Sequence, residues 1–430
     1  MAGPSPVRSD EQIRILCITI VLFGNVSFRS VPRILSLFLS GDQWIPHFTS
    51  VINWTLRLGL ALLNQVAPID DAWVAILDHS IDIGIKKVLV VLRVRLGALQ
   101  ARGSALRLED CECVGIQVSE KTDGETIAAG LSEIFESAGA PVAIIKDGGR
   151  DLARGVELWQ SGIAEEVEVI DDIGHVTANA LKAQYAKSKL FAAFLSIINH
   201  CAKRLRQTRL AFLAPPKLRT KGRFQGISKF AEWAEKIIKA LDGVQGDPEY
   251  KKLRQALSGF SQVKDFVCSF ARSVLKASEI MKILKNQGLN KNSYTLCMDL
   301  AAQLPERSKV KKRITAWLEK HMLIHDRLGL GDMPMAVSSD IIESLFGKFK
   351  HILERGSMID MNRSVLIIPT LCGVGDPGRI QQMDLSNHAQ LVAWDQANIP
   401  YTQNRRRRAF LHGKPLHAVP KTGGILSQTG

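Results

Sequence analysis

The chain has 430 residues, too many for one ordinary domain and enough for two or three. Lys and Arg total 56 against 42 Asp and Glu, and the net charge of +14 favours a polyanionic partner, either nucleic acid or an anionic membrane surface. The longest apolar stretch, residues 15–23, falls far short of the roughly 20 residues that cross a bilayer and follows acidic residues, which argues against a transmembrane helix or a secretory signal.

Residues from about 10 to 66 are predicted to be all helical. Three short helices joined by tight turns are typical of a helix-turn-helix DNA-binding domain, which we place at residues 1–68. The third helix leaves Ser50, Asn53 and Arg57 facing outward, where a recognition helix carries its base and phosphate contacts. The alternative is a small helical bundle that packs on a neighbouring part of the protein.

After these helices the helical spacing of apolar residues gives way to short apolar runs. Five such runs predict β-strands at 73–77, 87–94, 113–118, 141–145 and 167–170. Helical spacing separates some of them, at 124–138 and 152–159. This order predicts a mixed α/β core whose first part covers residues 69–177. In an open α/β sheet, chemistry gathers at the carboxyl ends of strands, and Asp78 and Asp147 each follow such an end.

The strand signal then disappears, and residues 178–333 predict an all-α domain inserted into the α/β core. This region is rich in cations that we expect to contact DNA, among them Arg204, Arg219, Lys221 and Arg223. The core resumes over residues 334–400 with a strong helix from Asp340 to about 355 and a short strand at 365–368. Residues 401–430, which contain four consecutive arginines, are predicted to be a basic, mobile tail.

Seven cysteines are scattered through the chain, an odd number that does not predict a disulfide framework. Cys111 and Cys113 are too close together, and lack a second pair of ligands, for a zinc site. A reducing, cytoplasmic compartment fits this cysteine usage, and no membrane association is expected.

Two carboxylates at neighbouring strand ends, joined by a third from a packed helix, could hold two Mg²⁺ ions about 4 Å apart, with Mn²⁺ as a possible substitute. Such a pair of ions activates the attacking oxygen and stabilises the leaving oxygen in phosphoryl transfer. Asp78 and Asp147 suit the strand positions, and Glu343 suits the helix position. On the face of its helix that carries Glu343, Gly347 would let a phosphate backbone approach closely and meet Lys350.

Each of these acids also has a simpler interpretation. Asp78 could cap a turn at a strand end, and Asp147 precedes two glycines and could be a turn residue. Glu343 lies three residues after Asp340, which is the spacing of an N-terminal capping box. As an ordered set in the right element types, however, the three favour catalysis. Four further aspartates compete for the strand-end roles: Asp82, Asp151, Asp171 and Asp172.

Three segments, in the same order along the chain, resemble the catalytic segments of bacterial insertion-sequence transposases of the DDE type. They are DHSIDIGIKKVL (78–89), DGGRDL (147–152) and SSDIIESLFGKFK (338–350). The resemblance implies a ribonuclease H-like core with the acidic triad Asp78, Asp147 and Glu343. It also implies cleavage at the ends of a mobile element in double-stranded DNA, followed by attack of a 3′ hydroxyl on target DNA, by a homo-oligomer associated with the bacterial nucleoid.

A second likeness follows the fifth predicted strand. Many cut-and-paste transposases have an Asp/Cys-x-x-His motif there, which Asp172 and His175 resemble, and many interrupt the core with a helical insertion. The resemblance implies that His175 supports the site by contacting DNA or a carboxylate. The alternative is a helix-start Asp with a partly buried His. In some relatives a Trp of the insertion stacks on DNA bases, and Trp233 and Trp317 are the candidates here.

Two other functions remain open from the sequence. The first is a ribonuclease H-like nuclease or resolvase that cuts DNA without joining it. The second is an inactive, domesticated transposase that acts as a sequence-specific DNA-binding protein. The intact carboxylate set argues against the second alternative, whereas the sequence does not separate the first from a transposase.

Overall fold

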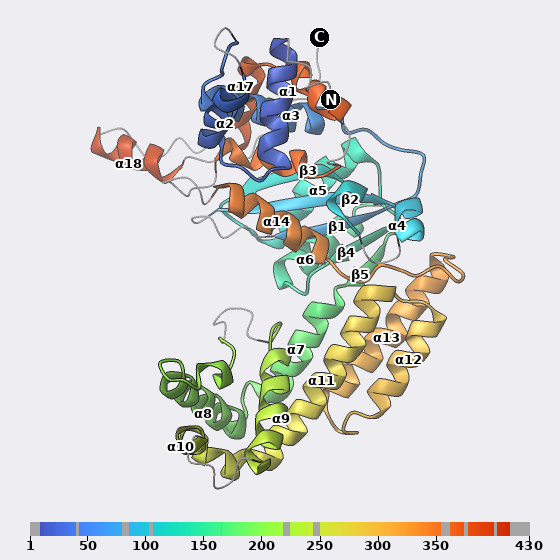
Figure 1. Ribbon diagram of the computed structural model, residues 1–430. Helices are drawn as coiled ribbons and strands as arrows, with labels where there is room; N and C mark the ends of the chain where they lie inside the picture. Colours follow the sequence, from blue (N-terminus) through green and yellow to red (C-terminus); the bar gives the residue numbers. More distant parts are fainter. Residues whose placement is uncertain are drawn as a thin grey trace, which may run out of the picture. The chain divides into compact units, whose positions relative to one another are not determined.

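The computed structural model describes residues 9–39, 43–79, 86–102, 106–164, 166–217, 224–243, 250–353, 362–373, 377–399 and 402–412 (Figure 1). The chain divides into two compact units. The first, called the sheet unit, comprises residues 1–102, 106–169 and 339–430. The second, called the helical unit, comprises residues 103–105 and 170–338.

One five-stranded sheet organises the sheet unit, and each of the five predicted apolar runs forms one of its strands, which confirms the mixed α/β prediction. The strands are β1 (Trp73–His79), β2 (Lys87–Arg95), β3 (Cys111–Ser119), β4 (Ala143–Lys146) and β5 (Glu168–Asp171). Their order across the sheet is β3-β2-β1-β4-β5. β1 pairs antiparallel with β2, and β2 pairs antiparallel with β3, whereas β1 and β4 are parallel.

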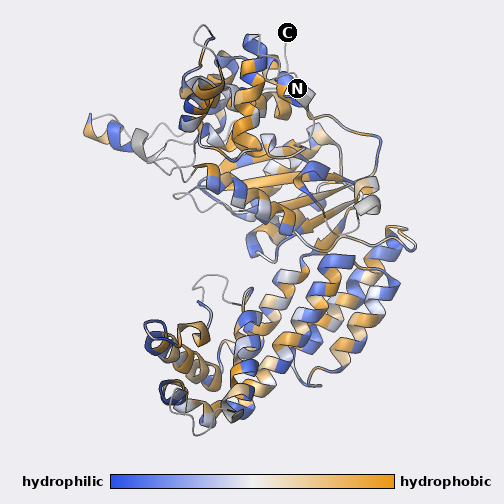
Figure 2. Ribbon diagram, viewed as in Figure 1, coloured by the Kyte–Doolittle hydropathy of each residue, from blue (hydrophilic) through white to orange (hydrophobic). Residues whose placement is uncertain are grey.

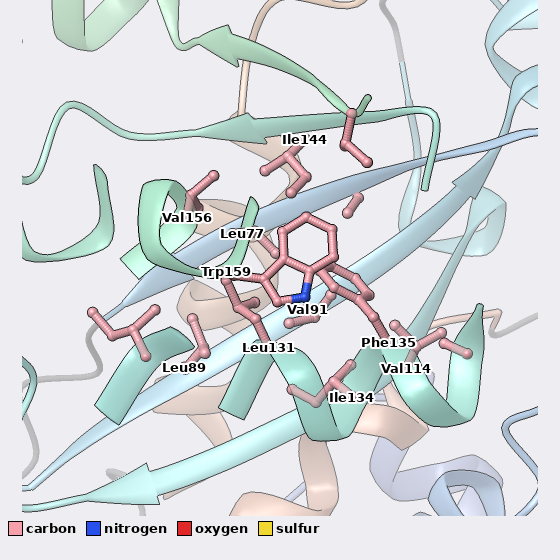
Figure 3. Packing of buried hydrophobic residues seen from close by; sticks show 14 of the residues in the cluster. Leu77, Leu89, Val91, Val114, Leu131, Ile134, Phe135, Ile144, Val156 and Trp159 are labelled. Carbon is pink, nitrogen blue, oxygen red and sulfur yellow. The ribbon is translucent and has the colours of Figure 1, made fainter. Parts of the chain in front are cut away.

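Two helices, α5 (Gly124–Ala138) and α6 (Arg150–Gln160), cover one face of the sheet and confirm the helices predicted at 124–138 and 152–159. Alternate strand residues point to this face, because side chains along a strand alternate between its two sides. From β1 these are Trp73, Ala75 and Leu77. Figure 3 shows Trp159 of α6 against Phe135 of α5, with ring centroids 4.7 Å apart, above the strands.

The other face of the sheet is covered by α14 (Asp340–Leu353), the helix predicted from its apolar stripe. It contacts β1, and its buried side chains lie outside the cluster on the α5 and α6 face. The short strand predicted at 365–368 is wrong, since this run forms the 3-10 helix η6 (Arg363–Leu366) and α15 (Ile367–Thr370). Four consecutive apolar residues do not distinguish a strand from a buried helix, and here α15 and η6 pack against the helix α3 (Phe48–Asn64).

The N-terminal helices belong to the sheet unit and do not form a compact domain of their own at residues 1–68. They are α1 (Asp10–Leu22), η1 (Phe28–Ser30), α2 (Val31–Phe38) and α3. Ser9 caps α1 with a capping box completed by Gln12. The core of these helices includes Ile380 and Met383 from α16 (Pro377–Gln381) and η7 (Gln382–Leu385), so the two ends of the chain share one hydrophobic cluster.

Four further elements complete the sheet unit: α4 (Leu96–Arg102), η2 (Leu108–Asp110), α17 (His388–Asn398) and α18 (Gln403–Leu411). The helix α18 occupies part of the segment predicted to be a mobile tail, and residues 413–430 lie outside the described residues. Within the described ranges, no helix combines the length and the apolar character that a membrane crossing requires.

The main segment of the helical unit begins at residue 170, inside β5, and ends at residue 338, before α14; the insertion at 178–333 stays a prediction. The elements of the helical unit are α7 (Ile173–Tyr185), α8 (Lys189–Leu205), η3 (Ala211–Leu213), α9 (Ser228–Gly243), α10 (Lys251–Ala256), η5 (Ser258–Val263), α11 (Lys264–Gln287), α12 (Lys291–Ala302) and α13 (Lys309–Arg327). Figure 2 shows mostly hydrophobic strands in the sheet, whereas helices of the helical unit carry both hydrophobic and hydrophilic residues. The latter is the composition of amphipathic helices that bury one side.

Candidate active site

Asp78 and Asp147 lie at the ends of two neighbouring parallel strands. The register pairs Val74 of β1 with Ala143 of β4, and continues to Leu77 opposite Lys146. Asp78 and Asp147 are the next residue on each strand, and adjacent strands are about 4.8 Å apart. The two carboxylates therefore start from neighbouring backbone positions, although β2, β3 and α5 separate them along the chain.

The side chain of Asp78 belongs to the face of the sheet that α14 covers. Leu77 points into the core beneath α5 and α6, so the alternation along β1 directs Asp78 to the opposite side. Only 9% of Asp78 is exposed to solvent, which is unusual for an aspartate. A buried carboxylate requires polar or charged neighbours to compensate for its loss of hydration, whereas a solvated turn residue does not.

Asp147 closes the turn that connects β4 to α6. The backbone N–H of Gly149 donates a hydrogen bond of 2.8 Å to Asp147 Oδ1, which confirms the interpretation of Asp147 as a turn residue. A Cβ atom at position 149 would lie 2.9 Å from the same oxygen, so glycine permits the close approach. This hydrogen bond holds the half-buried carboxylate at the carboxyl end of β4, and a turn role is compatible with a catalytic one.

His79 is a site residue that the sequence pattern did not indicate. It follows Asp78 at the end of β1 and is partly buried. Burial lowers the pKa of His79, and the charge of Lys87 lowers it further, while the charges of Asp147 and Asp151 oppose the shift. His79 therefore lies within electrostatic reach of Asp147, and burial favours the neutral form of its ring. Its position directly after a candidate catalytic aspartate was the only signal in the sequence.

Glu343 lies in the first turn of α14, the helix that contacts β1. Its side chain is exposed, as is Gly347, while Lys350 is half-buried. A Cβ atom at Gly347 would meet no other atom within 4 Å, so packing inside this chain does not require glycine there. The helix thus presents an open stretch of backbone between an exposed carboxylate and a cation.

The fit of these acids to a metal ion is partial. Carboxylate oxygens suit Mg²⁺, and β1 and β4 bring two of them to neighbouring positions. Within the ranges that the structure describes, however, no three or more His, Cys, Asp or Glu side chains form a group that could hold a metal ion. Asp78, Asp147 and Glu343 are therefore not assembled as a ready metal site.

Asp172 and His175 lie together at the start of α7 in the helical unit. Asp172 is the N-cap, and its Oδ1 accepts a hydrogen bond of 2.8 Å from the backbone N–H of His175. The same oxygen is 3.3 Å from His175 Nδ1, and His175 Nε2 lies 3.0 Å from the Gln225 amide nitrogen. The motif thus forms a capped helix start with a partly exposed histidine, as the simpler interpretation has it.

The competing aspartates have other contacts or positions. Lys320 contacts the Asp171 carboxylate at 2.9 Å, while Asp151 is exposed in the first turn of α6. Asp82 lies outside the described residues. Of these acids, Asp147 is the one that directly follows β4 beside Asp78.

Trp317, a candidate for base stacking by the resemblance, has instead the usual core role of a Trp on an amphipathic helix, because it is only 4% exposed. Its indole N–H donates to the backbone carbonyl of Asp171 at 2.9 Å, and its ring stacks on His321. Trp233 is half-buried and donates to the carbonyl of Leu213. Both indoles are thus anchored inside the helical unit, which is the usual role of Trp on an amphipathic helix.

The prediction that Asn53 and Arg57 face outward from α3 is also wrong. The Arg57 guanidinium donates to the Ser386 carbonyl at 2.7 Å and contacts Asp384 at 3.2 Å. Asn53 accepts a hydrogen bond from His388 at 3.2 Å. The C-terminal segment covers this side of α3, so the alternative of a bundle packed on a neighbouring part is the one observed. Ser50 remains half-buried.

The cations predicted to contact DNA in the insertion can be placed only in part. Arg204 is exposed in the last turn of α8. Arg219, Lys221 and Arg223 lie outside the described residues.

Comparison with known proteins finds similarity among solved structures. No family model matches the chain, and no curated protein sequence matches it. Among solved structures, a Drosophila P element transposase strand transfer complex is similar, with 13% sequence identity and a TM-score of 0.45. The match covers 88% of this chain and 94% of that chain. At this identity and score, the similarity assigns neither a family nor an activity to the chain.

Proposed function

We propose that this chain is a DDE-type DNA transposase that cleaves and joins DNA strands, with Asp78, Asp147 and Glu343 as its catalytic carboxylates. One observation carries the proposal: Asp78 near the end of β1 and Asp147 directly after β4 occupy neighbouring positions on two adjacent parallel strands, and the helix that bears Glu343 contacts β1. This is the arrangement that the three transposase-like sequence segments lead one to expect of a ribonuclease H-like core.

The arrangement of the elements supports the same proposal. Three antiparallel strands are followed by two further strands on the other side of β1, and a helical unit separates β5 from the helix of Glu343. An α/β sheet binds its ligands at the carboxyl ends of parallel strands, which is where the two aspartates lie. The excess of cations over acids suits a DNA substrate, both at element ends and in target DNA.

In the proposed site, the chain supplies carboxylates that hold the metal and groups that align the DNA backbone. The carboxylates of Asp78 and Asp147 would hold Mg²⁺, or Mn²⁺ as its substitute, and the bound metal would supply charge neutralisation for phosphoryl transfer. Glu343 would complete the set by approaching the two aspartates when DNA and metal bind. Gly347 would let the DNA backbone approach α14 closely, where Lys350 can meet a phosphate.

The catalytic proposal is tested by Mg²⁺-dependent cleavage and joining of the DNA that flanks the native gene. We expect Glu343→Gln and Asp147→Asn to lower the rate at least about a hundredfold, as the removal of one group that stabilises charge in a transition state does. Asp151→Asn is the matched control, because it removes an exposed acid close to the same site. Activity that survives in Glu343→Gln and Asp147→Asn would refute the proposal.

The incomplete carboxylate group favours one alternative, an inactive transposase that acts as a sequence-specific DNA-binding protein. This alternative expects specific binding to the flanking DNA, no cleavage with Mg²⁺ or Mn²⁺, and a biological activity that Asp147→Asn leaves unchanged. A nuclease without joining activity is distinguished from a transposase by its reaction product. It hydrolyses an element end but does not join a 3′-hydroxyl end to a plasmid target.

We also propose that the active form is a homo-oligomer, since two element ends must meet in one complex. Light scattering on the complex with DNA tests this statement. A monomeric complex that performs strand transfer would contradict it.

A further inference from the structure

A basic hollow lies at the C-terminal end of α8 in the helical unit. Its volume is about 310 Å³, within the size range of pockets that take small ligands. Three cations line it: Lys203 and Arg206 from the end of α8, and Lys217 from the segment that follows η3. We call this hollow the α8 basic pocket.

Among the residues that the structure describes, the three cations of the α8 basic pocket have no acidic counterpart. No carboxylate lines the pocket, and within the described ranges the side chains of Lys203, Arg206 and Lys217 make no ion pair or hydrogen bond. Other lysines of the helical unit do pair with a nearby acid, for example Lys239 with Glu235 and Lys276 with Glu279. Like charges gathered without a counter-ion repel one another, which favours binding of an anion.

Helix stabilisation does not account for all three charges. Cations at the C-terminal end of a helix interact favourably with its dipole, and this covers Lys203 in the last turn of α8 and Arg206 at its C-cap. Lys217 is not part of α8 and follows two prolines that end the intervening loop. Its side chain nevertheless lines the same hollow, so two separate segments of the chain bring charge to one place.

The remaining lining residues define the shape of the ligand. The buried side chains of Ile198 and Ala202 supply an apolar wall, and Asn199 adds an exposed amide that can donate hydrogen bonds. A cationic rim beside an apolar wall suits a phosphate ester that carries a sugar, with the phosphate on the cations and the sugar against Ile198 and Ala202. A free inorganic anion would leave the apolar wall unused.

We propose that the α8 basic pocket binds the phosphodiester backbone of DNA, a statement that rests on the proposed function for its choice of nucleic acid. The pocket then gives the helical unit a sequence-independent grip on DNA, because phosphate contacts position a duplex without reading its bases. The contact adds to the affinity for any DNA and makes that affinity depend on salt.

The test measures binding of the full chain to a labelled duplex of arbitrary sequence by fluorescence anisotropy, over a series of salt concentrations. The pocket variant carries Lys203→Gln, Arg206→Gln and Lys217→Gln. The control variant carries Lys239→Gln, Lys276→Gln and Lys311→Gln, which removes the same charge from lysines that are paired with acids. Thermal melting checks that both variants fold.

We expect the pocket variant to bind at least about tenfold more weakly at moderate salt and to lose about 2–3 from its log–log salt slope, roughly 0.9 for each phosphate contact. The control variant should keep most of the wild-type affinity and most of the wild-type salt slope. An equal loss in the two variants would overturn the proposal, because it would assign the effect to net charge. Tight uptake of a free nucleoside triphosphate, abolished in the pocket variant while its DNA binding is unchanged, would overturn the DNA assignment.

A catalytic failure is distinguishable from failure of this proposal. Cleavage by Glu343→Gln tests the catalytic proposal, whereas duplex binding by the pocket variant and its lysine control tests the α8 basic pocket. If Glu343→Gln retains cleavage, the proposed function fails while the binding comparison still stands.

Discussion

The core of the sheet unit and the core of the helical unit are built from different kinds of contact. In the sheet unit, aliphatic side chains alternate along the strands and meet α5 and α6 in one cluster, which also contains the rings of Trp73, Phe135 and Trp159. In the helical unit, aromatic rings gather around Phe270, and buried side chains of α13 contact Asp171 of the same unit. Regular apolar spacing describes the strands of the first core, whereas the second core also depends on particular buried polar side chains.

His321 illustrates this dependence. It is fully buried on α13, and its Nε2 accepts a hydrogen bond of 3.0 Å from the backbone N–H of Asp171, which lies 150 residues earlier. Its Nδ1–H then donates to the carbonyl of Trp317 at 2.8 Å, so both ring nitrogens are used. The Trp317 indole N–H donates a hydrogen bond to the Asp171 carbonyl. These bonds satisfy buried polar groups that would otherwise destabilise the fold.

The largest expected effect tests the aromatic core. Phe270 is fully buried, with ring centroids 5.0 Å from Tyr185 and 5.5 Å from Phe191. Phe270→Ala should destabilise the helical unit by about 3–5 kcal/mol, the usual effect of removing a buried phenyl ring. Hydrogen exchange read by mass spectrometry should accelerate in α8 and α11 and stay unchanged in the sheet.

Phe212→Ala is the control for the ring cluster, because 75% of Phe212 is exposed and its loss should change stability by less than about 0.5 kcal/mol. If exchange in the sheet accelerates as much as in α11, the two units do not have separable cores and the comparison fails.

A smaller effect tests the close packing in the sheet unit. A Cβ atom at Gly59 of α3 would lie 1.7 Å from the backbone carbonyl oxygen of Leu366, so Gly59→Ala forces these segments apart. We expect a loss of about 1–3 kcal/mol in the free energy of unfolding, measured by urea denaturation.

Gly97→Ala, also in a helix of the sheet unit, provides the matched control. Its Cβ atom would meet nothing within 4 Å, and alanine favours a helix over glycine by about 1 kcal/mol, so this change should be neutral or stabilising. Equal destabilisation by the two substitutions would show that α3 and η6 do not meet as closely as the structure has them.

The smallest effect concerns His79. Its pKa is lowered below 6.5 mainly by burial, so the folded state favours the neutral ring. Stability that depends on neutral His79 is complete above the unfolded value near 6.5 and is lost as the pH falls through the lowered folded pKa. An NMR titration should give a pKa below 6.5, and Asp147→Asn should lower it further, because the charge of Asp147 raises it. If the pKa of His79 is the same in Asp147→Asn as in the wild type, His79 does not belong to the candidate site.

Much of the sheet was predictable because β1, β2 and β4 are buried on both faces and carry strong apolar runs. The positions of Asp78 and Asp147 at strand ends follow from the same runs. His79 was missed because its electrostatic neighbours come from elsewhere in the sheet unit, and no spacing in the sequence reports them. Arg57 was misplaced because its partners lie more than 300 residues later.

Local order along the chain therefore determined the strands, most helices of the sheet unit and the turn at Asp147, since these depend on apolar period, glycine and hydrogen bonds between near neighbours. Only the tertiary structure decided that the C-terminal segment covers α3, that residues 365–368 form a helix, and that Lys217 joins Lys203 and Arg206 around one hollow. Such contacts join residues distant in sequence, and their free energy depends on which surfaces meet in the folded chain.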